Sequence, residues 1–231
     1  MPACELVIFD CDGTLMDSEL IAAEVETAAL EPYGIKMSAL EFTRKFAGTS
    51  SETVQSVIEE EIGRALPDDH IKQVKQKMNE RLWREVKCVD GAHALLDNLD
   101  QPRCICSNAG LDKLKIELTR GELWDRFRPF VYSARDIEGV DRKPRPDIFL
   151  HAAKEFNVAA ERVAVVEDSV AGIEGARRAG MRVIGFTGGS HTYRGHADVL
   201  TDAGAETVVS RLSEIPAVVA AFEHWAIEDS V

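Results

Sequence analysis

Residues 6–19 are LVIFDCDGTLMDSE, a short apolar run that ends on two aspartates. Residues 6–9 are typical of a strand in the middle of a sheet, because a continuous apolar run can be buried on both faces. Asp10 and Asp12 follow where this strand ends, and a glycine and Thr14 then begin a turn. Two like charges so close repel each other, so the end of this strand needs a nearby positive charge.

The composition excludes several classes of function. A net charge of −13 disfavours binding to nucleic acid or to an anionic membrane, whose phosphates the chain would repel. No basic segment precedes a long apolar stretch, and no run approaches about 20 apolar residues. The five cysteines include no C-x-x-C pair, which disfavours disulfides and a zinc site. We therefore expect a cytoplasmic protein, with a monomer as the default oligomeric state.

The 231 residues suit one large domain or a core with an inserted module. Residues 16–87 carry a 3.6-residue apolar rhythm in four segments, the first capped by Asp17 or Ser18, and predict a helical bundle. From residue 88 onward, helical patterns alternate with short apolar strands, which predicts a parallel sheet. The expected fold is a Rossmann-like α/β core, residues 1–15 and 88–231, with helices on both faces and an inserted helical cap.

Polar side chains gather where the predicted strands end, which is where doubly wound sheets bind their ligands. They are Asp10, Asp12, Ser107, Asn108, Glu167 and Asp168, with Lys143 in the loop after the third strand. Two unit charges about 4 Å apart repel by roughly 4 kcal/mol at an effective dielectric near 20, so four carboxylates exceed what one lysine can offset. A single divalent cation would offset the repulsion among these carboxylates, and oxygen ligands favour a hard ion such as Mg²⁺.

Plainer interpretations exist for the same residues. The D-x-D-G stretch could be a calcium loop, but an EF-hand needs a glutamate where Ile21 stands and a helix before it. The two aspartates could merely solubilise a strand end, and Ser107 or Asn108 could cap the following helix. The loop around His191, with its Gly-Gly pair, is more typical of a turn than of a cofactor site.

Four motifs in order resemble the haloacid dehalogenase superfamily of phosphohydrolases. FDCDGT (9–14) is similar to its D-x-D-G-T motif, and ICSN (105–108) to its second motif. RKPRPDIF (142–149) contains the lysine of the third, and VVEDSVAGIEGARRAGM (165–181) is similar to the fourth. The match spans nearly the whole chain. The chain most resembles the branch that contains β-phosphoglucomutase and small sugar-phosphate phosphatases, 6-phosphogluconate phosphatase among them.

The resemblance implies a role for each motif residue. Asp10 would attack phosphorus and form an aspartyl-phosphate, while Asp12 would act as general acid and then as general base. The ligands of Mg²⁺ would be Asp10, the main-chain carbonyl of Asp12, Asp168 and Glu167. The groups that bind the phosphoryl group would be Thr14, Ser107, Asn108 and Lys143, of which Lys143 and Ser107 also serve catalysis.

FAGTSSET (46–53) resembles the family's substrate-specificity loop, which makes Gly48, Thr49 and Ser51 candidate substrate contacts. A β-phosphoglucomutase carries an arginine where this chain has Ser51 and a histidine where it has Ala22. The missing arginine would remove a charge-assisted contact to a second phosphate.

We therefore expect a Mg²⁺-dependent phosphatase acting on a small phosphorylated metabolite, a sugar phosphate by family likeness. A β-phosphoglucomutase-type mutase is the alternative. A non-catalytic scaffold is disfavoured because Asp10, Asp12 and Lys143 are all present.

Overall fold

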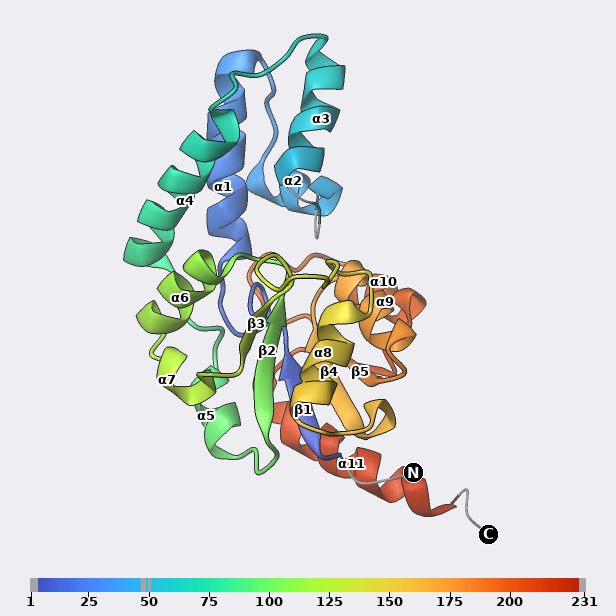
Figure 1. Ribbon diagram of the computed structural model, residues 1–231. Helices are drawn as coiled ribbons and strands as arrows, with labels where there is room; N and C mark the ends of the chain where they lie inside the picture. Colours follow the sequence, from blue (N-terminus) through green and yellow to red (C-terminus); the bar gives the residue numbers. More distant parts are fainter. Residues whose placement is uncertain (1–3, 47–48, 50, 229–231) are drawn as a thin grey trace.

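The computed structural model describes residues 4–46, 49 and 51–228, with side chains described up to Phe222. A parallel sheet forms its centre, with the strand order β3-β2-β1-β4-β5-β6 (Figure 1). The strands are β1 (Leu6–Phe9), β2 (Arg103–Ser107), β3 (Val131–Ser133), β4 (Val163–Glu167), β5 (Arg182–Phe186) and β6 (Thr207–Val209). Every residue of β1 is buried, as its apolar run predicts, and β1 pairs with β2 on one side and β4 on the other.

Helices cover both faces of the sheet because side chains of one strand alternate between two cores. Val7 and Phe9 of β1 belong to one core cluster, and Leu6 and Ile8 to the other. The first cluster is closed by α5 (Ala92–Asp97), α6 (Leu111–Arg120), α7 (Trp124–Phe127) and α11 (Ile215–Glu228). The second is closed by α8 (Asp147–Glu155), α9 (Val170–Arg178) and α10 (His196–Ala203). The predicted α/β fold class is therefore confirmed.

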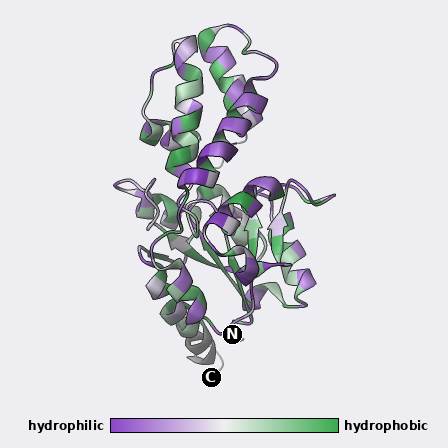
Figure 2. Cartoon of the chain, turned by 90° about the vertical axis from the view of Figure 1, so that its left-hand side faces the viewer, coloured by the Kyte–Doolittle hydropathy of each residue, from purple (hydrophilic) through white to green (hydrophobic). Residues whose placement is uncertain are grey.

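Of the α-helices that follow β1 and precede β2 in the sequence, the first four stand over the carboxyl ends of the strands (Figure 1). They are α1 (Glu19–Leu30), α2 (Ala39–Phe46), α3 (Ser51–Ile62) and α4 (His70–Glu85), hereafter the helical insert. Figure 2 shows apolar and polar residues alternating around these helices, as amphipathic helices require. The apolar faces of α1, α2 and α3 form a separate buried cluster, which includes Leu30, Phe42 and Ile58.

The chain enters and leaves the helical insert through two adjacent segments. The Asp17 N–H donates to the carbonyl of Lys87 at 2.9 Å, and the Val89 N–H donates to the carbonyl of Leu15 at 2.9 Å. The two crossings are thus held together by backbone hydrogen bonds. Among the described residues, no helix combines the length and the apolar character needed to cross a bilayer.

The predicted N-cap position of α1 is confirmed at Ser18, but its side chain does not cap the helix. Its hydroxyl donates instead to Asp12 at 2.5 Å. The Asp17 carboxylate accepts from the Ser190 N–H at 2.9 Å. Both side chains are used by tertiary contacts that the local sequence pattern does not encode.

Glu26 of α1 provides a test of the packing in the helical insert. Its side chain is 9% exposed, and burial raises its pKa from 4.5 to about 7. Between these two values the folded chain holds the extra proton, so stability falls as the pH rises through that window. The full cost, about 3 kcal/mol, is present above pH 7. Glu26→Gln should therefore raise the Tm by several degrees at pH 8 and change it little at pH 4.5.

Thermal unfolding followed by circular dichroism at the two pH values measures this difference. Glu31→Gln is the matched control, because Glu31 is exposed at the end of the same helix and should shift the Tm little at either pH. An equal gain from Glu26→Gln at both pH values would show that burial of the charge is not the cause.

Candidate active site

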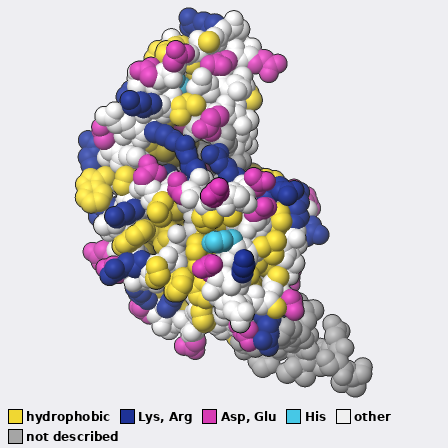
Figure 3. All heavy atoms as spheres, viewed as in Figure 1, with side chains coloured by type: hydrophobic (Ala, Val, Ile, Leu, Met, Phe, Trp, Pro, Cys, Tyr) yellow, Lys and Arg dark blue, Asp and Glu magenta, His cyan; other side chains and the backbone are white. Residues whose placement is uncertain are grey.

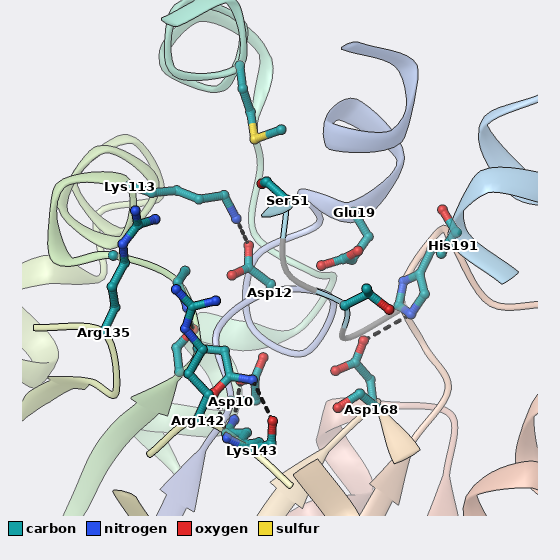
Figure 4. A pocket seen from close by; sticks show the side chains of 18 of the residues that line it. Asp10, Asp12, Glu19, Ser51, Lys113, Arg135, Arg142, Lys143, Asp168 and His191 are labelled. Atoms are coloured by element: carbon teal, nitrogen blue, oxygen red, sulfur yellow. Dashed lines mark hydrogen bonds and ion pairs between the residues drawn. The ribbon is translucent and has the colours of Figure 1, made fainter. Parts of the chain in front are cut away.

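A cavity of about 550 Å³ lies between the carboxyl ends of the strands and the helical insert. The strand order reverses around β1 and β4, so the cavity sits at the switch point where doubly wound sheets bind ligands. The predicted residues that line it are Asp10, Asp12, Thr49, Ser51, Ser107, Asn108, Lys143 and Asp168. Figure 4 shows how the labelled ones face one another. Gly48 lies outside the described residues.

Lys143 connects two carboxylates at the base of this cavity. Its Nζ lies 2.5 Å from Asp10 Oδ1 and 2.5 Å from Glu167 Oε1, and it donates to the carbonyl of Cys106 at 2.7 Å. The lysine side chain is 3% exposed. Burial alone lowers its pKa, but Asp10 and Glu167 outweigh burial and raise the pKa above its ordinary value. Lys143 therefore stays charged beside Asp10.

The second motif supports the loop that carries Lys143. The Lys143 N–H donates to Asn108 Oδ1 at 2.9 Å, and Asn108 Nδ2 donates to the Lys143 carbonyl at 3.2 Å. Ser107 Oγ accepts from the N–H of Ala109 at 3.0 Å. The Asn108 side chain thus positions the lysine loop, while the buried Ser107 hydroxyl forms part of the cavity wall.

Two predicted residues lie beneath the cavity rather than in its wall. Glu167 is fully buried, and besides Lys143 it accepts from the Ser169 hydroxyl at 3.0 Å. A Cβ on Gly172 would lie 1.9 Å from Glu167 Oε1, so only glycine leaves room for this carboxylate. Thr14 is also fully buried, and its hydroxyl donates to Asp168 Oδ1 at 3.2 Å.

Asp168 faces the cavity from the end of β4 and pairs with His191. His191 Nε2 lies 2.9 Å from Asp168 Oδ2 (Figure 4). Burial lowers the pKa of His191, but Asp168 outweighs it and raises the pKa to about 9. Gly13 has φ +72°, and a Cβ there would lie 2.1 Å from Asp168 Oδ2. The turn therefore requires glycine both for its backbone angle and for the close carboxylate.

Asp12 has its own lysine, which the sequence analysis missed. Lys113 of α6 contacts Asp12 Oδ1, and its Nζ lies 3.1 Å from Oε1 of the fully buried Glu117. Ser18 Oγ donates to the same Asp12 oxygen at 2.5 Å. Burial raises the pKa of Asp12, but Lys113 and Ser18 outweigh it and lower the pKa. Burial and Asp12 raise the pKa of Glu117 to about 8.

A hard cation fits the chemistry of this site. Asp10 and Asp168 follow the paired strands β1 and β4 and face one cavity with carboxylate oxygens, the ligands that hard divalent ions prefer. Within the described part of the chain, no three acidic, His or Cys side chains already converge to hold a metal. Lys143 and His191 pair with these two carboxylates, so a bound cation would compete with both contacts.

Residues 7–186 match the family model of haloacid dehalogenase-like hydrolases. The chain belongs to this family. It is similar to the 6-phosphogluconate phosphatase of Escherichia coli (strain K12), with 32% identity over 192 residues, 83% of this chain and 86% of the relative. The family resemblance predicted from the four motifs is thus confirmed.

Two solved haloacid dehalogenase-like structures show the same fold. A protein of unknown function from Agrobacterium tumefaciens str. C58 has 50% identity and a TM-score of 0.87, covering 94% of this chain and 98% of that one. A hydrolase from Deinococcus radiodurans R1, solved with bound phosphate and sodium, has 27% identity and a TM-score of 0.80, covering 96% and 97%.

The Lys113 contacts predict a large effect on stability in this hydrolase. Lys113→Met leaves the carboxylates of Asp12 and Glu117 buried without their cation, which typically costs about 3–5 kcal/mol. The Tm should fall markedly at pH 8 and less at pH 5, where these acids can take up protons. Adding Glu117→Gln should recover part of the loss at pH 8, because buried Glu117 then no longer has to hold a proton that the unfolded chain releases at that pH.

The control for this experiment is Lys115→Met on the same helix. Lys115 is exposed and lies over the ring of Trp124, 5.8 Å from its centroid, so its loss should change the Tm little. Equal losses for the two lysines would contradict a specific role for the Lys113 ion pairs.

Proposed function

We propose that this chain is a Mg²⁺-dependent phosphatase that hydrolyses a small phosphorylated metabolite, a sugar phosphate, through an aspartyl-phosphate on Asp10. The observation that carries this proposal is the buried contact of 2.5 Å between Lys143 Nζ and Asp10 in the cavity wall. The phosphatase name of the Escherichia coli relative and the phosphate bound in the Deinococcus structure support it.

In the first half-reaction, a carboxylate oxygen of Asp10 attacks phosphorus and the ester P–O bond breaks. Lys143 neutralises charge on Asp10 and on the arriving phosphoryl group, so that the two anions can approach. Asp12 gives its proton to the departing oxygen. A dianionic phosphoryl group close to Asp12 disfavours the carboxylate form, so substrate binding itself favours the protonated acid.

In the second half-reaction, water attacks the aspartyl-phosphate and inorganic phosphate leaves. Asp12, now ionised, accepts the proton of that water. Lys113 and Ser18 favour this ionised form and hold the carboxylate by the contacts described above. One residue can thus serve as acid and then as base, because each half-reaction leaves it in the state that the next one needs.

Mg²⁺ would be held by the side chains of Asp10 and Asp168 and by the main-chain carbonyl of Asp12. The ion supplies positive charge that offsets the phosphoryl oxygens. Glu167 points toward Lys143 and Ser169 and away from the cavity, so we assign it the positioning of Lys143 in place of direct metal binding.

The helical insert would be the cap that sets substrate specificity. With the two crossing segments, this cap comprises residues 16–87. Thr49 and Ser51 line the cavity from this side and are candidate substrate contacts. A cap must open for substrate and close to exclude water. The paired crossings near residues 15–17 and 87–89 are the natural hinges.

The phosphatase proposal predicts Mg²⁺-dependent release of phosphate from p-nitrophenyl phosphate and from a panel of sugar phosphates. Excess EDTA should abolish turnover, and added Mg²⁺ should restore it.

Asp10→Asn should lower kcat at least a thousandfold, because an amide is a poor nucleophile, and should leave the Tm near that of the wild type. Substantial turnover by Asp10→Asn would refute the covalent route. No turnover of any phosphate ester with Mg²⁺ would favour a scaffold.

Ser51 and Ala22 predict little mutase activity, because the arginine and histidine that the mutase resemblance implies are absent. With β-glucose 1-phosphate and a bisphosphate primer, we expect phosphate release to exceed formation of glucose 6-phosphate at least tenfold. A coupled assay for glucose 6-phosphate measures the ratio. Efficient isomerisation would make the chain a mutase.

A further inference from the structure

We propose that the cavity contains a second anion-binding subsite, formed by Arg135, Arg142 and Lys75, that binds a carboxylate of the substrate. This inference rests on the proposed phosphatase function and specifies its substrate class as phosphate esters that also carry a carboxylate. All three cations line the cavity. Arg135 and Arg142 lie in the loop between β3 and α8, and Lys75 lies on α4 of the helical insert.

The three cations are not used by the catalytic groups. Lys143 and Lys113 each contact two carboxylates, whereas among the described residues Arg135 and Lys75 have no ion pair within 4.0 Å. Arg142 has Glu52 only at 3.9 Å. Guanidinium and ammonium groups in a cavity wall that are unpaired, or paired only at the limit of contact as Arg142 is, offer donors to an anionic ligand.

Asp136, next to Arg135 in sequence, forms no ion pair with the three cations among the described residues, but it shares their field. Hydrogen bonds from Leu111 and Ser133, and then the charges of Arg135 and Lys75, lower the pKa of its carboxyl. Its carboxylate already accepts from the Leu111 N–H at 2.7 Å and from the Ser133 hydroxyl at 2.8 Å. The hydrogen-bond donors of Arg135 and Lys75 therefore remain available to a ligand, while Asp136 offsets part of their charge.

The subsite adjoins the phosphoryl-binding wall, so one small substrate can reach both. Arg142 directly precedes Lys143, and Arg135 packs on the loop after Asn108, where a Cβ on Gly110 would lie 3.6 Å from Arg135 Cδ. Figure 4 shows Arg135 and Arg142 on one side of Asp12, and His191 on the other. Figure 3 shows Lys and Arg side chains gathering, beside acidic ones, where the helical insert meets the core.

The charges of this wall favour a carboxylate over a second phosphate. Glu52 and Asp112 also line the cavity, and their charges offset part of the three cations. Arg44 adds one more cation to the wall and Asp136 one more acid beside it, so the remaining charge still suits a monoanion, whereas a second dianionic phosphate would be left partly uncompensated. The chain as a whole carries −13, so binding of any anion depends on this local cluster.

The experiment compares two probes that differ only in this group, 6-phosphogluconate and sorbitol 6-phosphate. Both have a six-carbon polyol chain with the same phosphate, but the first ends in a carboxylate and the second in a hydroxymethyl group. Isothermal calorimetry with Asp10→Asn in the presence of Mg²⁺ measures binding without turnover. We expect 6-phosphogluconate to bind at least tenfold more tightly, and Arg135→Gln/Arg142→Gln on the same background to reduce the ratio to about twofold or less.

Lys45→Gln is the matched control. Lys45 is a cation of the helical insert, but it pairs with Glu61 at 2.8 Å and does not line the cavity. It should leave the binding ratio unchanged. A ratio near one in the parent protein, or a ratio that survives the double arginine substitution, would overturn the subsite.

Failure of this proposal is distinguishable from failure of the phosphatase proposal. Turnover of p-nitrophenyl phosphate by the wild type tests the phosphatase chemistry and involves no carboxylate. Turnover without discrimination between the two probes would refute only the subsite.

Discussion

The buried contact of Lys143 with Asp10 and Glu167 is the constraint on which the rest of the site depends. Two carboxylates at the ends of neighbouring strands can be buried together only if a positive charge lies between them. That charge must come from a loop distant in sequence, and Asn108 fixes this loop by two hydrogen bonds to its backbone. The hydrogen bonds of Asn108, in the second motif, thus position the lysine that offsets the charge of Asp10 in the first motif.

The fold was predictable because its signals are local. The apolar run of β1, the alternation after residue 88 and the 3.6-residue rhythm of the helical insert each follow from which faces must be buried. The strand ends then converge at the switch point of the sheet, so Asp10, Asp168 and Lys143 could be predicted to lie together. The prediction that the Ser18 side chain caps α1 was wrong, because its hydroxyl donates to a tertiary partner, Asp12, instead.

The residues that sequence analysis missed are those whose roles depend on packing between elements. Lys113 and Glu117 have the i,i+4 spacing of an exposed ion pair. Only the packing of α6 into the core cluster that includes Phe9 of β1 places them against Asp12. His191 lies in a loop that resembles an ordinary turn. Its position just beyond a strand end was the available signal, since every such loop reaches the same rim. Arg135 and Arg142 likewise belong to a connecting loop without a periodic pattern.

The paired aspartates of the opening strand are stable side by side because each has its own cation. Lys143 approaches Asp10 from the β3–α8 loop, whereas Lys113 approaches Asp12 from α6, on the other side of the turn. Separate partners allow the two carboxylates to differ in proton affinity although only one residue separates them. In the proposed mechanism, the nucleophile Asp10 needs a permanent positive charge close by, and the proton-transferring Asp12 needs one that the substrate can counterbalance. Two lysines on independent elements meet both needs, which a single shared cation could not.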